Sequence, residues 1–292
     1  MINKSVSVII AAYNEERFIM HCLSSIFDQT LRPHEIIVVD DGSSDRTWEI
    51  LQNISKINTA IKIYHKSHLE QATARNFGFT KSNGAILVFP DADYYFDRKF
   101  IECLVKPIIN GKAVATFTNE EYIANPDNVW SKCWNINAYL PIGCRLPVNS
   151  PKRANNFRAI LRSEFERAGG FSETGYSNDI TVLNKLCKKD AGLAVNGAVC
   201  FHYNPHTLAK VYSAAYRKGR KGGVPLSIRN FFIFLPFNSL RKGFLVALKE
   251  HMFQYLIFKL VFDFGIVTGI SVRLILAKLT QDTNLIKLGA KY

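Results

Sequence analysis

The amino-acid sequence predicts an α/β protein: a mostly parallel central sheet flanked by helices, followed by a helical, membrane-associating extension. In roughly the first 95 residues, short apolar runs alternate with segments of helical spacing, as is typical of a parallel sheet covered on both faces. After about residue 222 the composition changes to long apolar pieces interrupted by single basic residues. At 292 residues, the chain can form one large α/β domain with an appendage or two small domains.

Four apolar runs of strand length, rich in β-branched residues, lie in the amino-terminal part. They are Val6–Ala12, Glu35–Val39, Ile61–Tyr64 and Ala85–Phe89. Helical spacing of apolar residues follows the first three, at Glu15–Phe27, Thr47–Ile57 and Glu70–Lys81. Because parallel strands end at one edge of a sheet and ligands bind there, we expect the polar loops after these strands to meet.

The alternation loosens after Asp93. We expect a helix over about 98–109, a strand at Ala113–Thr118, and an irregular stretch rich in Trp, Asn and Pro to about Ser150. A strand over 155–161 should then return to the sheet. The remaining expected elements are a helix at Ser163–Ala168, a turn at Gly169–Phe171, a helix at Asp179–Lys188 and a strand at Ala198–His202.

Charge is distributed unevenly along the chain. The net charge is +13, and residues 210–292 hold fourteen Lys and Arg against three acidic residues. This basic extension indicates an anionic partner, which is either a membrane surface or nucleic acid, unless it is merely a solvated basic face. We expect no nucleic acid partner, because the acidic loops repel a polyanion and no interleaved basic and aromatic pattern is present.

Six cysteines, at positions 22, 103, 133, 144, 187 and 200, show no Cys-x-x-Cys spacing. They are expected to be reduced thiols in a cytosolic compartment. The first apolar run is broken by Asn14 and is too short for a signal peptide, so the first domain is expected to stay in the cytosol.

The apolar runs of the extension, at 230–240, 251–258 and 264–272, are each shorter than the roughly 18 residues of a spanning helix. A simple transmembrane anchor is therefore not expected. On a helical wheel one face carries Lys259, Asp263, Ile266, Ile270 and Arg273 and leaves a wide apolar arc. Two interpretations stay open: a helix lying in a membrane interface, or a helix pair that packs on the domain.

Asp91 and Asp93 occupy alternate positions after the apolar strand that ends at Phe89. Carboxylates two residues apart at a strand end can point toward one ligand, and hard oxygen ligands suit Mg²⁺ or Mn²⁺ beside a phosphate. Two further acidic loops, Tyr13–Glu16 and Asp40–Asp45, should reach the same edge of the sheet. The sequence therefore predicts a cation site among three converging loops.

Four ordered motifs, Val6–Glu15, Ile36–Asp45, Ala74–Gly78 and Asp91–Asp93, together resemble glycosyltransferase family 2, whose GT-A fold binds nucleotide sugars. The resemblance runs to about residue 222. It implies a GT-A catalytic domain over residues 1–222, with the nucleotide-sugar half at about 1–95 and the acceptor half at about 96–222. Residues 223–292 would then be a basic amphipathic helical extension.

The resemblance also implies roles for individual residues. The nucleotide sugar would be held by Ala12, Tyr13, Glu15, Asp40, Asp41, Arg75, Asp91, Ala92 and Asp93. Asp93 would be the main ligand of Mn²⁺ or Mg²⁺, with Asp91 on the ribose or a metal-bound water and His202 completing the metal shell. Two alternatives stay open: Arg75 as an ion-pair partner that ties its helix to the acidic edge, and His202 as a structural histidine.

On the acceptor side, Gly170 and Phe171 resemble the family's acceptor turn, and Asp179 matches its catalytic base. Asn178 departs from the usual Glu before that base, and a helix cap is the alternative role for Asp179. Arg217 and Arg220 resemble a segment that closes over the diphosphate, or they could meet lipid phosphate.

The implied activity is an inverting, metal-dependent transfer of a sugar from a nucleotide-diphosphate donor, expected to be UDP-linked. The acceptor would be a hydroxyl of a glycan or of a lipid-linked saccharide at the cytosolic membrane face, and the enzyme would be peripheral there. The Gln-x-x-Arg-Trp signature of processive synthases is missing after the last strand, so single addition is expected. The alternative is a polyprenyl-phosphate glycosyltransferase, and a homo-oligomer stays open.

Overall fold

The computed structural model describes residues 4–68, 70–147, 151–154, 156–172, 178–186, 192–224, 234 and 236–280. The chain divides into two compact units, one of residues 1–124 and 146–202 and the other of residues 125–145 and 203–292. This division differs from the expected boundary at residue 222, because the segments 125–145 and 203–222 group with the carboxyl-terminal helices.

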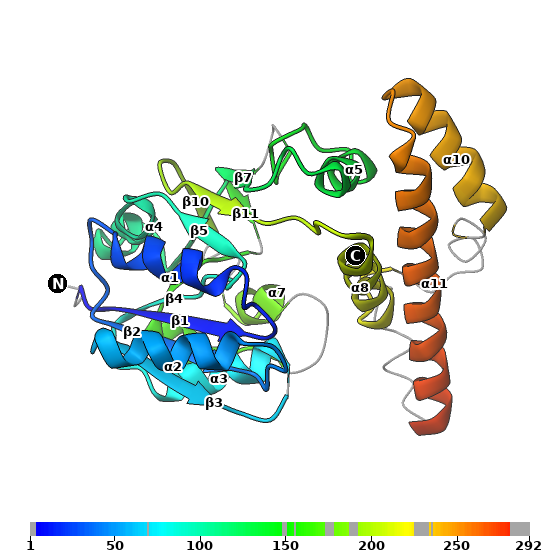
Figure 1. The fold of residues 1–292 in the computed structure, drawn as a ribbon. Helices are drawn as coiled ribbons and strands as arrows, with labels where there is room; N and C mark the ends of the chain where they lie inside the picture. Colours follow the sequence, from blue (N-terminus) through cyan, green and yellow to red (C-terminus); the bar gives the residue numbers. More distant parts are fainter. Residues whose placement is uncertain are drawn as a thin grey trace. The chain divides into compact units, whose positions relative to one another are not determined.

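The first unit is built on a sheet whose described strands run in the order β3-β2-β1-β4-β9-β6-β10-β8 (Figure 1). The strands are β1 (Val6–Ala12), β2 (Glu35–Asp40), β3 (Ile61–His65), β4 (Ile86–Val88), β6 (Ala115–Thr118), β8 (Arg153–Ala154), β9 (Ala159–Leu161) and β10 (Gly192–Val195). Strands β1 to β4 are parallel, and β9 runs antiparallel between β4 and β6. The mostly parallel α/β architecture is confirmed, including the return of a strand over 155–161.

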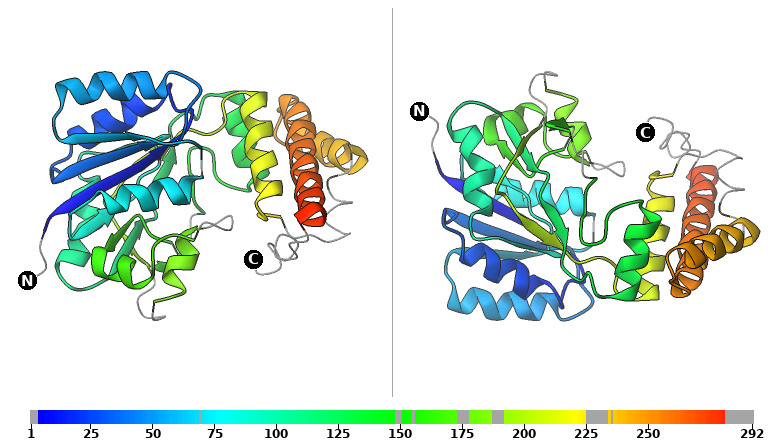
Figure 2. Two further views of the ribbon diagram at one scale, coloured as in Figure 1. Left: turned by 90° about the horizontal axis from the view of Figure 1, so that it is seen from below. Right: turned by 90° about the horizontal axis from the view of Figure 1, so that it is seen from above.

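Helices cover both faces of this sheet (Figure 2). They are α1 (Ile19–Phe27), α2 (Thr47–Ile57), α3 (Gln71–Thr80), α4 (Phe100–Ile109), α6 (Arg162–Arg167) and α7 (Asn178–Leu183). Alternate side chains of β1 enter different clusters: Val8 and Ile10 pack with α1, α2 and α4, whereas Ile9 packs with α6 and α7. Side chains of one strand point alternately to opposite faces, so both faces of the sheet are buried.

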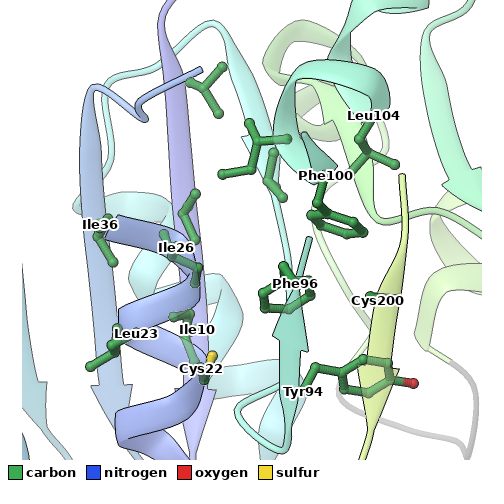
Figure 3. Packing of buried hydrophobic residues seen from close by; sticks show 14 of the residues in the cluster. Ile10, Cys22, Leu23, Ile26, Ile36, Tyr94, Phe96, Phe100, Leu104 and Cys200 are labelled. Atoms are coloured by element: carbon green, nitrogen blue, oxygen red, sulfur yellow. The ribbon is translucent and has the colours of Figure 1, made fainter. Parts of the chain in front are cut away.

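A second sheet in this unit contains three short strands in the order β5-β11-β7. They are β5 (Tyr94–Phe96), β7 (Glu121–Ile123) and β11 (Cys200–His202). The strand expected near the end of the domain therefore pairs outside the central sheet. Figure 3 shows Tyr94 and Phe96 of β5 beside Cys200 of β11, with Phe100 and Leu104 of α4 nearby. The antiparallel register pairs His202 with Tyr94, which places His202 next to Asp93.

The second unit is helical. It contains α5 (Val129–Asn137), α8 (Leu208–Arg220), α10 (Pro236–Lys249) and α11 (Gln254–Thr280). Of the described helices, only α11 is long and apolar enough to cross a membrane by length and composition. The helix is thus longer than any of the uncharged runs in the sequence, and the expectation that it is not a simple transmembrane anchor stays a prediction. The separate uncharged runs of the sequence are continuous in one helix, because Lys259 and Asp263 form an ion pair at 2.6 Å instead of interrupting it.

Candidate active site

Hydrogen bonds join the loops that follow β1 and β2. Asn14 has a left-handed φ of 58°, which asparagine tolerates, and its Oδ1 accepts from the N–H of Ser44 at 2.8 Å. The N–H of Asp41 donates to the carbonyl of Ala12 at 2.8 Å. Tyr13, between Ala12 and Asn14, is thereby held beside the second loop.

Asp40, the last residue of β2, is buried, and both of its oxygens have partners. Its Oδ1 accepts from Ser43 Oγ at 2.5 Å, and its Oδ2 lies 2.7 Å from His65 Nδ1. These contacts make Asp40 a support for its own loop. Its expected contact with a nucleoside stays a prediction.

Asp41 lies beside two stacked rings. Its Oδ2 accepts from the N–H of Glu70 at 3.0 Å and lies 3.0 Å from His68 Nδ1. The His68 ring stacks on Tyr13 with centroids 4.1 Å apart and an interplanar angle of 25°. Gly42 allows the backbone of this loop to approach the backbone at His68, since its φ is 75° and a Cβ there would lie 2.7 Å from the His68 backbone nitrogen. Tyr13 is 44% exposed, so a flat base can stack here.

Two arginines hold Asp91. Arg75 Nη2 donates to its Oδ1 at 2.5 Å, and Arg158 Nη1 donates to its Oδ2 at 2.7 Å. Arg158 also donates to Glu121 at 3.3 Å. Burial alone would raise the pKa of Asp91, but the charges of Arg158 and Arg75 outweigh it and hold the pKa well below its usual range. The ion pair that the alternative for Arg75 requires is present. The expected contacts of Arg75 with the nucleotide and of Asp91 with the ribose or the metal stay predictions.

Acidic side chains from two loops converge on Cys22. Burial raises the pKa of this thiol, and the nearby carboxylates of Asp93, Asp91 and Glu15 raise it further. Its Sγ lies 3.7 Å from the carbonyl of Asp91. Glu15 from the first loop therefore lies at the same edge of the sheet as the Asp91–Asp93 loop, whose middle residue, Ala92, is buried.

Asp93 and His202 are the pair that could hold a divalent cation. His202 Nε2 lies 3.2 Å from Asp93 Oδ2, and the Asp93 side chain is 31% exposed. Within the described residues, no group of three or more His, Cys, Asp and Glu side chains could hold a metal. Mg²⁺ commonly takes only one or two protein ligands and completes its shell with water and substrate phosphates. One carboxylate and one imidazole at an accessible edge fit that chemistry.

The turn at Gly170 and Phe171 is tied to α3 by Asn76. Asn76 Oδ1 accepts from the Phe171 N–H at 2.9 Å, and its Nδ2 donates to the Phe171 carbonyl at 2.9 Å. Gly170 has a φ of 74°, and a Cβ there would lie 2.8 Å from Asn76 Oδ1. Beside this turn, the guanidinium of Arg75 lies 5.5 Å from the centre of the Phe171 ring.

Asp179 lies near the start of α7, next to the arginine network. Burial raises the pKa of its carboxyl; Arg75 and Arg158 pull the pKa down, while Asp91 and Glu121 push it up, and the net direction is upward. A carboxylate with a raised pKa is a stronger base. The side chain of Asn178 lies outside the described residues. Arg217 and Arg220 lie on α8 in the second unit and are exposed.

Sequence reasoning missed four residues of this site: His65, His68, Asn76 and Arg158. The histidines had a signal, since they lie at and after the end of a strand whose neighbours end in acidic loops. Asn76 lay inside a quoted motif but had no assigned partner. Arg158 gave no local signal, because its contacts with Asp91 and Glu121 join segments 67 and 37 residues apart in the chain.

Comparison with known proteins identifies the family. Residues 7–169 match the profile of Glycosyl transferase family 2, which is more than half of the chain. The chain belongs to glycosyl transferase family 2. It is therefore a glycosyltransferase, and the fold and enzyme class expected from its motifs are confirmed.

Two curated relatives illustrate the similarity. Glycosyltransferase GlyA of Streptococcus pneumoniae is 32% identical over 113 residues, covering 39% of this chain and 16% of GlyA. Poly-beta-1,6-N-acetyl-D-glucosamine synthase of Staphylococcus aureus is 24% identical over 235 residues, covering 78% of this chain and 57% of the synthase. The matches thus cover well under two thirds of either relative.

Solved structures show the same fold. The mannosyltransferase PcManGT from Pyrobaculum calidifontis, in complex with GDP-Man and Mn²⁺, has a TM-score of 0.56 at 17% identity and covers 98% of this chain and 78% of its own. S. aureus TarS 1–349, in complex with UDP, has a TM-score of 0.52 at 15% identity and covers 92% of this chain and 91% of its own. At these identities the likeness is one of fold.

Proposed function

We propose that this glycosyltransferase moves one sugar, with inversion, from a UDP-linked or other nucleotide-diphosphate donor to a hydroxyl of a glycan or lipid-linked saccharide. The observation that carries the proposal is the gathering of Tyr13, Asp41, Asp93 and His202 with the buried carboxyl of Asp179 in one compact unit. Family neighbours in complex with UDP and with GDP-Man support a nucleotide-sugar donor.

The base of the nucleotide stacks on Tyr13, and Asp41 accepts a hydrogen bond from a base N–H or a ribose hydroxyl. His68 already stacks on Tyr13 at 4.1 Å, so it either moves or serves as a second wall for the base. Asp40 and Glu15 support this pocket. Arg75, paired with Asp91 at 2.5 Å, contributes a positive charge that would favour the ribose-phosphate part of the donor.

Asp93 and His202 would hold the divalent cation. A Mn²⁺ or Mg²⁺ ion held there would supply positive charge to neutralise the leaving diphosphate. A PcManGT complex that holds Mn²⁺ supports this assignment. On the protein side, the arginines on Asp91 fix the loop that carries Asp93, because both oxygens of Asp91 are engaged.

Asp179 is the general base. Its carboxylate takes the proton of the acceptor hydroxyl as that oxygen attacks the anomeric carbon, and the bond from that carbon to the diphosphate oxygen breaks. The nucleoside diphosphate leaves on the opposite face, so the anomeric configuration inverts. Burial of Asp179 favours this role, since the raised pKa strengthens the base.

The second candidate is transfer to a polyprenyl phosphate. The basic extension favours it equally, with fourteen Lys and Arg against three acidic residues over 210–292. A phosphate acceptor is already ionised and has little need of a base. In both cases we place the enzyme at the cytosolic membrane face, where a lipid-linked acceptor is within reach.

Asp179→Asn separates the two candidates. We expect sugar transfer to a hydroxyl acceptor to fall by about a hundredfold or more, which is the range of general-base catalysis, while transfer to a polyprenyl phosphate would largely survive. The assay screens UDP-, GDP- and dTDP-sugars with Mn²⁺ against both acceptor classes, and the configuration of the product is read by NMR. Absence of donor hydrolysis and transfer with every donor would contradict the proposal.

A further inference from the structure

The second unit exposes many large apolar side chains besides those of its buried core. Eighteen large apolar side chains are exposed among the described residues, and twelve of them lie between residues 237 and 279. They are Phe237, Leu240, Phe244, Leu245, Leu248, Phe253, Ile257, Phe264, Leu274, Ile275, Leu276 and Leu279. Large exposed apolar patches are rare on monomeric soluble proteins and mark sites of interaction. We name these residues the apolar face of α10 and α11.

Three of the four charged residues of α11 are buried instead, whereas Lys278, in the last turn, is exposed. Lys259, Asp263 and Arg273 are 9%, 1% and 1% exposed. Lys259 Nζ donates to Asp263 Oδ1 at 2.6 Å, and Ser239 of α10 donates to Asp263 Oδ2 at 2.6 Å. A helix lying on a membrane surface would turn these charges to water. The face predicted to be polar is therefore the one that contacts the other helices.

Small residues bring these helices close together. A Cβ at Gly269 would lie 2.2 Å from the Tyr216 carbonyl of α8, and one at Gly265 would lie 2.8 Å from the Tyr212 carbonyl. On α10, the residues on the buried side are Ser239, Gly243 and Ala247, and a Cβ at Gly243 would lie 3.0 Å from Leu256. Close approach through small residues spaced by four is typical of helices that pack within lipid.

We propose that the apolar face of α10 and α11 is seated in the hydrocarbon of an anionic bilayer, with the Lys259–Asp263 pair inside the helix bundle. The occupant is lipid rather than a second copy, because eight of the twelve residues of the face are Leu or Ile and none is Tyr, Trp, Met or Arg, whereas protein interfaces are enriched in aromatic residues, Met and Arg. Helix α10 adds exposed Arg241 and Lys242 and contains no acidic residue, which favours anionic headgroups; its third cation, Lys249, pairs with Glu250 at 3.7 Å. This inference extends the membrane contact that the proposed function assumes. Its evidence comes only from the helices of the second unit, so it does not depend on the catalytic site.

Helix length agrees with this placement. Helix α11 contains 27 residues and at 1.5 Å per residue reaches about 40 Å, against a hydrocarbon core of about 30 Å. Contact with lipid can therefore extend over most of the helix. The contact is apolar, so it should survive high salt, which screens charge but not hydrocarbon burial.

The test is flotation of the full chain with vesicles of phosphatidylcholine, alone or mixed with phosphatidylglycerol. We expect the protein to float with both, more with the mixture, and to stay bound in 1 M NaCl, a concentration at which the screening length is about 3 Å. Ile257→Gln combined with Phe264→Gln should lower the partition coefficient about tenfold or more. Both sites are exposed, so the variant should keep its fold, which circular dichroism checks.

The matched control is Met20→Gln combined with Ile57→Gln, at exposed apolar positions of the first unit, and it should float like the wild type. Binding to anionic vesicles only, with release by salt, would overturn the proposal. So would a stable dimer without detergent that does not float and that the Ile257 and Phe264 changes dissociate. Sugar transfer is measured separately, so a chain that floats but transfers nothing contradicts the proposed function and leaves this inference standing.

Discussion

At the scale of single residues, the protonation of Asp179 links the structure to a measurable pH dependence. Burial raises the pKa of this carboxyl, so it keeps its proton to a higher pH than an ordinary aspartate does. The base must be ionised to act. As the pH falls, kcat/KM should therefore decline with an apparent pKa above the usual aspartate value of about 3.9. A pH profile of sugar transfer to a hydroxyl acceptor tests this prediction. A decline of kcat/KM with an apparent pKa at or below that value would contradict the assigned role.

Arg158 is the residue on which two buried carboxylates depend. Arg158→Met removes its bonds to Asp91 at 2.7 Å and to Glu121 at 3.3 Å. Breaking a buried ion pair from one side costs about 3–5 kcal/mol, so we expect a loss of that order in the free energy of unfolding, measured by urea denaturation.

Arg46→Met is the control for this change. Arg46 pairs with Glu49 at 3.1 Å, but the two side chains are 72% and 56% exposed, and exposed pairs contribute about 1 kcal/mol or less. Equal losses in both variants would show that Arg158 is not the centre of a buried network.

At the scale of elements, the α10–α11 hairpin predicts a result for its buried ion pair. Lys259→Met leaves Asp263 charged and without its lysine, and Asp263→Leu leaves Lys259 in the same position. Each single change should cost about 3–5 kcal/mol, while the double change replaces the pair by apolar side chains and should cost far less. Thermal unfolding in one detergent measures all four proteins. If the double variant loses as much stability as the two single variants together, Lys259 and Asp263 do not stabilise each other, which would contradict the pairing.

The sequence predicted the elements best where the pattern is local. Val6–Ala12 and the strands near 35 and 61 are continuous apolar runs between loops, and all three form as expected, with β1 and β2 in matched register. Strands β5, β7 and β11 contain three residues each. Strand β11 lies within the expected strand Ala198–His202, but its pairing with β5 and β7 joins segments far apart in the chain. No local periodicity could reveal β5, β7 or the second sheet. The helix Val129–Asn137 was likewise hidden in a stretch read as irregular.

Helix α11 shows a different limit of sequence reasoning. The wheel grouped Lys259, Asp263 and Arg273 correctly on one face, but which face meets water depends on neighbours that the wheel does not contain. Asp263 accepts from Ser239 of α10, and the Arg273 side chain donates to the carbonyl of Val224 at 3.1 Å. These contacts bury the polar face, so the same pattern produces the opposite orientation.

At the scale of the whole molecule, we assign the two units to different surroundings: the first unit to water and the apolar face of the second unit to lipid. The first unit has a conventional core, with Ile9, Leu23 and Phe100 at most 1% exposed, and an acidic edge for a soluble donor. The second unit buries charge and exposes hydrocarbon. Under the proposed function, the enzyme would take its donor from water and meet a lipid-linked acceptor at the membrane.

The most direct test of the central claim is calorimetric titration of UDP into the full chain, with Mn²⁺ present or removed by EDTA. Asp93→Asn removes the main expected metal ligand, and Asp97→Asn, on the exposed side of the same segment, is the matched control. We expect binding that weakens about tenfold or more both with EDTA and in Asp93→Asn, and that is unchanged in the control. Binding of UDP that is indifferent to the metal and to Asp93, or absence of binding by every nucleoside diphosphate, would contradict the account.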